Sequence, residues 1–383
     1  MSIIKKTILL LIFSLSLLGC SSGVDDEEVI ETVTLSKDHL PRQMTNSGTI
    51  HNQRVYIPYP SFENVGEKGV PYIIGEISNN NLNYVNDTPS NLCNKGDVTQ
   101  CSTFNTGWIE SLIVTDDYII TVEDAFGALK FETYLTIQNL DGSNRKEIVE
   151  LKANPNPLFD FQIQSDNENI YFILKDELHR YSIKEDKLDN LTEDLEMRYL
   201  SNLKLEDNDK LYFSVNTFEK DGVKYSNAII EYDGDFNVKQ SNIEKEIFRV
   251  YKDKYFVKVV TDITEAYINY YTDEDIPIPL ENQGFMYVLS VDDKVVTYDT
   301  TLNDGFQHYI RLYEDTGSGL KQLDVYEFVD HEMYFLHAIE GNMILFSKNT
   351  DSSTGAMFIE PITIEIVDNK LTNIKYHPYQ ADK

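Results

Sequence analysis

Positive charge and cysteine are both scarce in this sequence. Its 383 residues include three cysteines, and 33 lysines and arginines stand against 64 aspartates and glutamates, so the formal net charge is −31. Such a chain repels phosphate groups and gains nothing from counterion release, which excludes nucleic acid as a partner. Anionic lipid headgroups are disfavoured as a docking surface for the same reason.

The short motifs of common enzymes are also missing. The sequence has no G-x-S-x-G elbow, no phosphate loop, no dinucleotide fingerprint and no H-E-x-x-H motif. The histidines show no spacing typical of a metal site; they are His39, His51, His179, His308, His331, His337 and His377. We therefore predict no catalytic residue, no cofactor and no metal, although a site assembled from distant loops would leave no such motif.

Long apolar runs are absent except near the N-terminus. A membrane-spanning helix needs about 18 or more continuous apolar residues, and no stretch reaches that length. The run Thr7 to Leu18 follows Lys5 and Lys6 and ends in Leu17-Leu18-Gly19-Cys20. A positive segment, a short apolar run and small residues predict a signal peptide over residues 1–19.

The segment Leu17-Leu18-Gly19-Cys20 resembles the lipobox of bacterial lipoproteins. The resemblance implies cleavage between Gly19 and Cys20 and attachment of fatty acyl chains such as palmitate to Cys20. Each buried methylene contributes about 0.8 kcal/mol, so several chains form a firm membrane anchor. We expect residues 20–47 to be a lipidated tether and the protein to lie in the cell envelope, at the periplasmic face or the outer surface of the outer membrane. The alternative is an ordinary signal peptide with an incidental cysteine.

Two further cysteines, Cys93 and Cys101, lie close together on a polar segment. In an exported chain such a pair most simply forms a local disulfide. A metal site with two thiolates is the alternative, but no histidine lies near. We place the pair in an insertion over residues 86–108.

Aromatic and β-branched residues recur in short runs, which favour β-strands. Seven runs, usually preceded by Asp or Asn, begin at Arg54, Tyr118, Ile170, Leu211, Tyr255, Lys294 and Met343. Each is followed by a second strand and most by a weaker third, at a spacing of roughly 40 to 65 residues, close to that of a four-stranded propeller blade. The pattern predicts an all-β propeller over residues 48–378, with seven blades of four antiparallel strands. A pair of β-sandwiches is the alternative.

The clearest repeat, Tyr171 to Thr192, has the pattern strand, turn, Glu-Leu-x-Arg-Tyr strand, turn, Leu-x-x-Leu-Thr. It resembles blades of the broad TolB-like group among bacterial β-propeller lipoproteins. No repeat ends in tryptophan-aspartate or carries a kelch glycine pair or the tryptophan-docking repeat of quinoprotein propellers. The functions of those groups are therefore not implied.

Four repeats have long predicted loops between their first two recognisable strands, which places these loops on one face. Carboxylates and aromatic rings alternate there, a combination that suits sugars or cationic peptides. The predicted binding residues are Glu123, Asp124, Phe126, Phe218, Glu219, Asp221, Asp304 and Phe306. The alternative is a set of solvated hairpin tips in an acidic protein.

Asp233 to Asn237 has oxygen ligands at the spacing of a calcium loop, but Val238 occupies the position of the obligatory glycine. An Asx turn explains this segment equally well, so calcium binding stays open. The sequence predicts a lipid-anchored, non-catalytic binding or scaffold protein for an envelope protein or a glycan. The alternatives are a hydrolase or lyase that acts on an extracellular polymer at a central channel, and a structural lipoprotein without a ligand.

Overall fold

The computed structural model describes about three fifths of the chain. The described residues are 48–60, 72–78, 81–84, 108–127, 130–140, 143–152, 163–206, 209–244, 247–251, 254–260, 266–271, 287–301, 307–316, 320–328, 333–351 and 357–377. They all belong to one compact unit, Thr34–Lys383. The predicted signal peptide, the tether with Cys20, and Cys93 and Cys101 lie outside the described residues.

The described residues form β-strands and no helix, so within these ranges no helix is long and apolar enough to cross a membrane. The strands are β1 (Thr49–His51), β2 (Arg54–Pro60), β3 (Tyr72–Ser78), β4 (Asn81–Tyr84), β5 (Trp108–Val114), β6 (Tyr118–Gly127), β7 (Lys130–Asn139), β8 (Lys146–Lys152), β9 (Ile163–Ser165), β10 (Asn169–Leu174), β11 (Glu177–Ser182), β12 (Lys187–Asn190), β13 (Glu196–Arg198) and β14 (Ser201–Leu205). They continue with β15 (Leu211–Lys220), β16 (Val223–Tyr232), β17 (Phe236–Gln240), β18 (Ile247–Tyr251), β19 (Lys254–Val260), β20 (Ala266–Tyr271), β21 (Tyr287–Val291), β22 (Lys294–Thr301), β23 (Gln307–Asp315), β24 (Leu320–Phe328), β25 (Met333–Glu340), β26 (Met343–Asp351), β27 (Met357–Val367) and β28 (Lys370–Tyr376).

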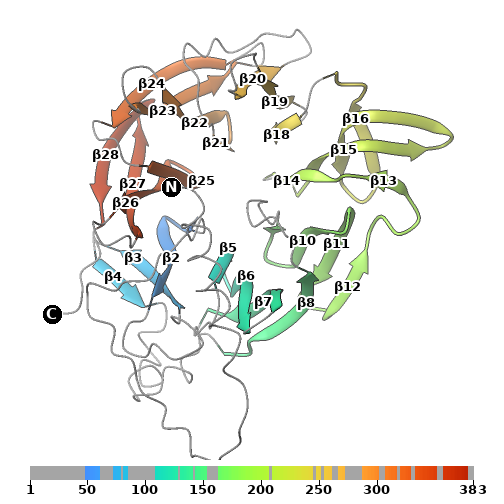
Figure 1. Cartoon of the computed structure of the whole chain (residues 1–383), viewed down its shortest axis with the longest axis horizontal. Helices are drawn as coiled ribbons and strands as arrows, with labels where there is room; N and C mark the ends of the chain where they lie inside the picture. Colours follow the sequence, from blue (N-terminus) through green and yellow to red (C-terminus); the bar gives the residue numbers. More distant parts are fainter. Residues whose placement is uncertain are drawn as a thin grey trace, which may run out of the picture. The chain divides into compact units, whose positions relative to one another are not determined.

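These strands pair into seven antiparallel sheets, each built from consecutive strands. We number them in chain order: sheet 1 contains β1–β4, sheet 2 β5–β8, sheet 3 β9–β12, sheet 4 β13–β17, sheet 5 β18–β20, sheet 6 β21–β24 and sheet 7 β25–β28. Strands near the start of neighbouring sheets contact one another: β1 contacts β5, β5 contacts β9, β9 contacts β14 and β14 contacts β18. Of these strands, β5, β14 and β18 are labelled in Figure 1. The strand β21 likewise contacts β25, and β25 contacts β1, so the last sheet packs against the first. This arrangement is a β-propeller, as predicted.

The predicted number of four-stranded blades is wrong. Five sheets have four strands, whereas sheet 4 has five and sheet 5 has three among the described residues. Sheet 4 gains a strand because its first strand is divided into β13 and β14 by Tyr199 and Leu200. Both pieces pair with the same long strand, β15.

The recurring apolar runs form the strands that pair on both sides, such as β2, β6 and β10. In sheet 3, apolar side chains on both faces of such a strand are buried, because this sheet packs between sheets 2 and 4. Ile170 and Phe172 of β10 pack toward sheet 2, whereas Tyr171 belongs to the apolar cluster shared with sheet 4. Burial on both faces explains why this strand reads as a continuous apolar run.

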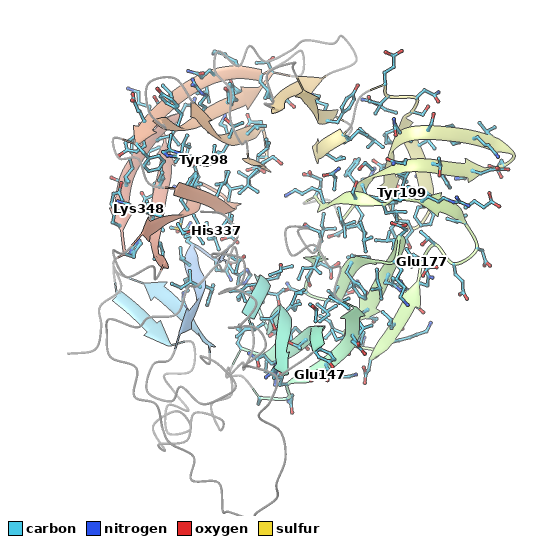
Figure 2. All side chains as sticks on the ribbon, viewed as in Figure 1. Glu147, Glu177, Tyr199, Tyr298, His337 and Lys348 are labelled. Atoms are coloured by element: carbon cyan, nitrogen blue, oxygen red, sulfur yellow. The ribbon has the colours of Figure 1, made fainter. Side chains whose placement is uncertain are left out.

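Contact between sheets 1 and 7 depends on side chains, because no described strand is shared between them. Ile50 and Val55 of sheet 1 form an apolar cluster with Leu345 of sheet 7. Gly48 approaches this seam so closely that an added Cβ would lie 2.7 Å from a Leu345 methyl carbon. His337, labelled in Figure 2, hydrogen-bonds through Nε2 to the Ser347 hydroxyl at 2.6 Å within sheet 7.

Candidate functional site

Strand-to-strand hairpins of unequal length mark one end of the sheets, which we call the hairpin end. At this end β6 turns into β7, β10 into β11, β15 into β16, β22 into β23 and β26 into β27. The strands β15 and β16 have 10 residues each, whereas β10 and β11 have 6 each (Figure 1). Two of the four predicted long loops are strands instead: residues 123–127 lie in β6 and residues 216–220 in β15, so these segments are hairpin arms and the prediction of loops is corrected there. Most of the other two predicted loops, residues 302–306 and 352–355, lies outside the described residues.

The predicted binding residues of sheet 2 lie on the arm β6–β7. Glu123 and Asp124 of β6 pair with Tyr134 and Thr133 of β7. Phe126 pairs with Phe131 one step before the end of the arm. Their binding role stays a prediction. Asp304 and Phe306 lie outside the described residues.

Phe218 does not lie on the surface, which corrects its assignment as a binding residue. Its side chain is 1% exposed and belongs to the apolar cluster between sheets 3 and 4. Its ring lies 6.0 Å from that of Tyr225, and it pairs with Met197 across the sheet. Successive residues of a strand face opposite sides, so Phe218 faces inward while Glu219 faces outward.

The outward face of this hairpin arm carries two rows of polar side chains. Glu196 of β13 pairs with Glu219 of β15, which pairs with Lys224 of β16. The second row, two residues along, consists of Arg198, Thr217 and Ser226. We call these six residues the platform; Glu219 is partly exposed and the others are exposed.

The arm ends in a two-residue turn at Asp221-Gly222. Both residues have positive φ, 54° and 76°. An Asp-Gly pair with two positive φ angles is typical of the turn that matches the twist of a hairpin. The predicted residue Asp221 is therefore exposed at the tip of the arm, and its binding role stays a prediction.

Tyr199, directly after Arg198, is a residue that the sequence analysis did not identify. It lies beside β13 and β14 in Figure 2, its side chain is 63% exposed, and its φ is +54°. Of the sixteen described non-glycine residues with positive φ, thirteen are Asn or Asp, and Tyr199 is the one aromatic residue. A bulky residue in this region is an outlier that costs of order 1–2 kcal/mol. No sequence pattern predicts the positive φ of Tyr199, because this angle depends on how β13 and β14 pair with β15.

A polar network joins four sheets at the opposite end, where first strands turn into second strands. We call it the turn-end network: His51, Asn52, Asp116, Asn167 and Glu340. His51 Nε2 lies 2.9 Å from Asp116 Oδ1, and the Asn52 amide donates to the same oxygen at 3.0 Å. Asn167 donates to Asp116 Oδ2 at 3.1 Å, and the Asp116 N–H donates to Asn167 Oδ1 at 3.2 Å.

Glu340 connects this network to sheet 7. Its carboxylate accepts the backbone N–H groups of Asn52 and Gln53 at 3.2 and 3.1 Å. Both turn residues have positive φ, 51° and 61°. The Glu340 carboxylate therefore binds both backbone N–H groups of the turn between β1 and β2. Glu340 lies 288 residues after Asn52, so no local sequence pattern indicates the contact.

Hydrogen bonds set the electrostatics of the turn-end network. Donation from Asn52, then from His51 and Asn167, lowers the pKa of the exposed Asp116 carboxyl below its usual value. Asp116 is therefore ionised at neutral pH, and its contact with His51 Nε2 can orient the His51 ring. An imidazole held against a carboxylate has the elements of general acid–base chemistry.

No group of three or more His, Cys, Asp or Glu side chains in the described ranges could bind a metal ion. Asp233 to Asp235 form the turn between β16 and β17, and Phe236 and Asn237 begin β17. The Asn237 amide donates to Asp233 Oδ1 at 3.3 Å, and Gly234 has a φ of +108°. These contacts are those of a hydrogen-bonded turn, and calcium binding stays open.

No family model and no curated protein matches this sequence. Among solved structures, the chain is similar to the β-propeller domain of the Trilobed protease from Pyrococcus furiosus, with a TM-score of 0.52 and 12% identity over 90% of this chain and 100% of that one. Acylaminoacyl peptidase from Pyrococcus horikoshii gives a TM-score of 0.47 and 12% identity over 87% of this chain and 52% of that one. Puromycin hydrolase gives 0.46 and 9% over 95% and 57%. At this identity the likeness to the P. furiosus domain shows the fold alone: this chain is a β-propeller.

Proposed function

We propose that this protein is a lipid-anchored β-propeller of the cell envelope that binds an envelope protein or a glycan through its hairpin end. Its own role is binding or scaffolding rather than catalysis. The observation that carries the proposal is the hairpin arm β15–β16. Its ten-residue strands present an exposed polar face, the platform, whereas the six-residue strands β10 and β11 build a complete blade without such an arm.

The arm is firmly built, which supports a binding role. Its inward face is secured by Phe218, and Lys224 Nζ lies 3.5 Å from a Glu219 carboxylate oxygen on its outward face. The strand β13 covers the outer half of β15 as a third strand. The paired strands already order the main chain that carries these polar groups, so a partner needs to order only their side chains.

The first test is a pull-down from envelope extracts with the double variant Arg198→Ala/Glu219→Ala. We expect at least a tenfold loss of the partner recovered with the unchanged protein, because both side chains lie on the exposed platform. Glu327→Ala on β24 is the matched control and should leave recovery unchanged. Equal recovery by the double variant would show that the platform is not the binding surface.

The anchor rests on the lipobox residues and has its own test. Cys20→Ala removes the sulfur that would carry the acyl chains, so we expect the variant to leave the membrane fraction. Even one acyl chain on another group would not keep the variant in the membrane, because firm anchoring needs several acyl chains. Fractionation of cells followed by immunoblotting measures this, and Ser21→Ala is the control. Membrane association that persists in Cys20→Ala would contradict the anchor.

A second candidate function is that of a hydrolase or lyase, which would cleave an extracellular polymer by hydrolysis or by elimination. The turn-end network favours it, because His51 and Asp116 lie 2.9 Å apart and Glu340 Oε1 lies 3.9 Å from His51 Nδ1. The P. furiosus propeller domain with the same fold belongs to a protease. Polymer cleavage that is present in the unchanged protein and lost in His51→Ala would favour this function over the first.

A further inference from the structure

We infer that the platform, together with Tyr199, is a binding site for an uncharged polysaccharide. This inference rests on the proposed binding function and names the ligand class of the same surface. The platform alone gives hydrogen-bonding groups, and Tyr199, the residue directly after Arg198, adds an exposed aromatic ring. Three observations support the assignment: the positive φ of the exposed Tyr199, the charge balance of the platform, and its extent over three paired strands.

The backbone conformation and the exposure of Tyr199 are both unfavourable for the stability of the fold. A positive φ is unfavourable for a side chain with a Cβ, and the tyrosine ring recovers little by burial because it is 63% exposed. Thirteen other described positions with positive φ carry Asn or Asp, which tolerate this conformation. Strain that persists without a packing benefit is typical of functional positions.

The charges of the platform cancel. The negative charges of Glu196 and Glu219 equal in number the positive charges of Arg198 and Lys224, although the net charge of the whole chain is −31. A surface that recognises a basic protein would use the abundant carboxylates of this chain, and one that recognises an acidic polymer would need an excess of lysine and arginine. A balanced set of donors and acceptors matches neutral hydroxyl groups, which both donate and accept.

The platform extends over three paired strands. Adjacent strands are about 4.8 Å apart, so each row spans about 10 Å, and the two rows are about 7 Å apart along the strands. This area is comparable with one or two sugar rings. Arg198 and Lys224 supply donors, and Glu196 and Glu219 supply acceptors. The Thr217 hydroxyl can do both, whereas the Ser226 hydroxyl, which donates to Asn242 Oδ1 at 3.0 Å, supplies an acceptor. The exposed ring of Tyr199 can stack on the apolar face of a sugar while its hydroxyl stays in water.

Affinity electrophoresis of the full-length protein in detergent tests the site. The native gels contain barley β-glucan, amylopectin or yeast mannan, three uncharged polysaccharides. We expect at least one of them to retard the protein, and Tyr199→Ala to weaken that interaction at least tenfold. Tyr199→Phe should retain it, because the stacking surface remains. Tyr376→Ala, at an exposed tyrosine of β28, is the control and should behave like the unchanged protein.

A second variant separates binding from stability. Asn tolerates a positive φ better than Tyr, so Tyr199→Asn should raise the Tm by about 1–2 °C while it abolishes retardation. A fall in Tm would show that Tyr199 has a structural role and would overturn the inference. Absence of retardation in all three gels, or equal retardation of Tyr199→Ala, would overturn it as well. If the pull-down then still depends on Arg198 and Glu219, the partner is a protein and the proposed binding function stands; if neither assay responds, both fail.

Discussion

Phe218→Ala should lower the free energy of unfolding by about 3–5 kcal/mol, the range for deleting a buried phenylalanine ring. The ring is 1% exposed and lies in the cluster that joins sheets 3 and 4. Its removal leaves a cavity beside Met197 and Tyr225, which β13 and β16 hold in place. Urea denaturation followed by circular dichroism measures the change as a shift of the midpoint at an unchanged m-value.

Thr217→Ala is the matched control, because Thr217 is the neighbouring residue and faces outward. Its replacement should change the free energy of unfolding by less than about 0.5 kcal/mol. A change below about 1 kcal/mol for Phe218→Ala, together with a loss of partner binding, would contradict the buried placement. The expected result also means that Phe218→Ala cannot test binding, since it would disturb the whole arm. The platform residues Arg198 and Glu219 are the suitable positions.

The sequence analysis placed Phe218 on a loop because a local sequence pattern does not show which other strand pairs with the segment. The segment Asn216 to Gly222 is polar apart from Phe218 and ends in Asp-Gly, so it reads as a loop. In the structure the strand continues because β13, from the preceding connection, pairs with its outer half. That pairing places Met197 beside Phe218 on the buried face of the sheet. Phe218, which the sequence pattern assigned to a loop, is therefore a core residue.

Local signals were strong enough to predict most strands. In the segment Ile170 to Thr192, apolar runs and polar turns predicted three strands, and the structure has β10, β11 and β12 there. The turn Lys175-Asp176 has two positive φ angles, 53° and 65°, as a two-residue hairpin requires. Periodicity and turn residues are properties of neighbouring residues, so sequence alone carries them.

The site residues that the sequence did not reveal depend on distant contacts. Glu340 meets the turn Asn52-Gln53 across the seam between sheets 7 and 1, and His51 meets Asp116 from another sheet. Nothing near either residue in sequence indicates its partner. Tyr199 was missed for a related reason: exposure and a positive φ follow from the division of the first strand of sheet 4, which is a tertiary feature.

Breaking the ion pair between Lys254 and Asp315 should be about as damaging as the loss of the Phe218 ring. Lys254 Nζ, from sheet 5, lies 2.8 and 2.7 Å from the two carboxylate oxygens of Asp315, from sheet 6. The two side chains are only 16% and 9% exposed. Lys254→Met leaves a buried carboxylate without this ammonium group, so we expect a loss of about 3–5 kcal/mol in the free energy of unfolding.

The double variant Lys254→Met/Asp315→Leu should be more stable than Lys254→Met, because removing both charges also removes the unfavourable burial of the remaining one. A double-mutant cycle measured by urea denaturation gives the coupling energy. Lys224→Met is the exposed control: its ion pair with Glu219 has 82% and 36% exposed side chains, so its loss should amount to less than about 1 kcal/mol. Equal effects of Lys254→Met and Lys224→Met would show that the Lys254 pair is solvated and that sheets 5 and 6 are held together by other contacts. A large difference would identify this pair as the electrostatic link between them, where burial rather than distance alone decides the energy of a salt bridge.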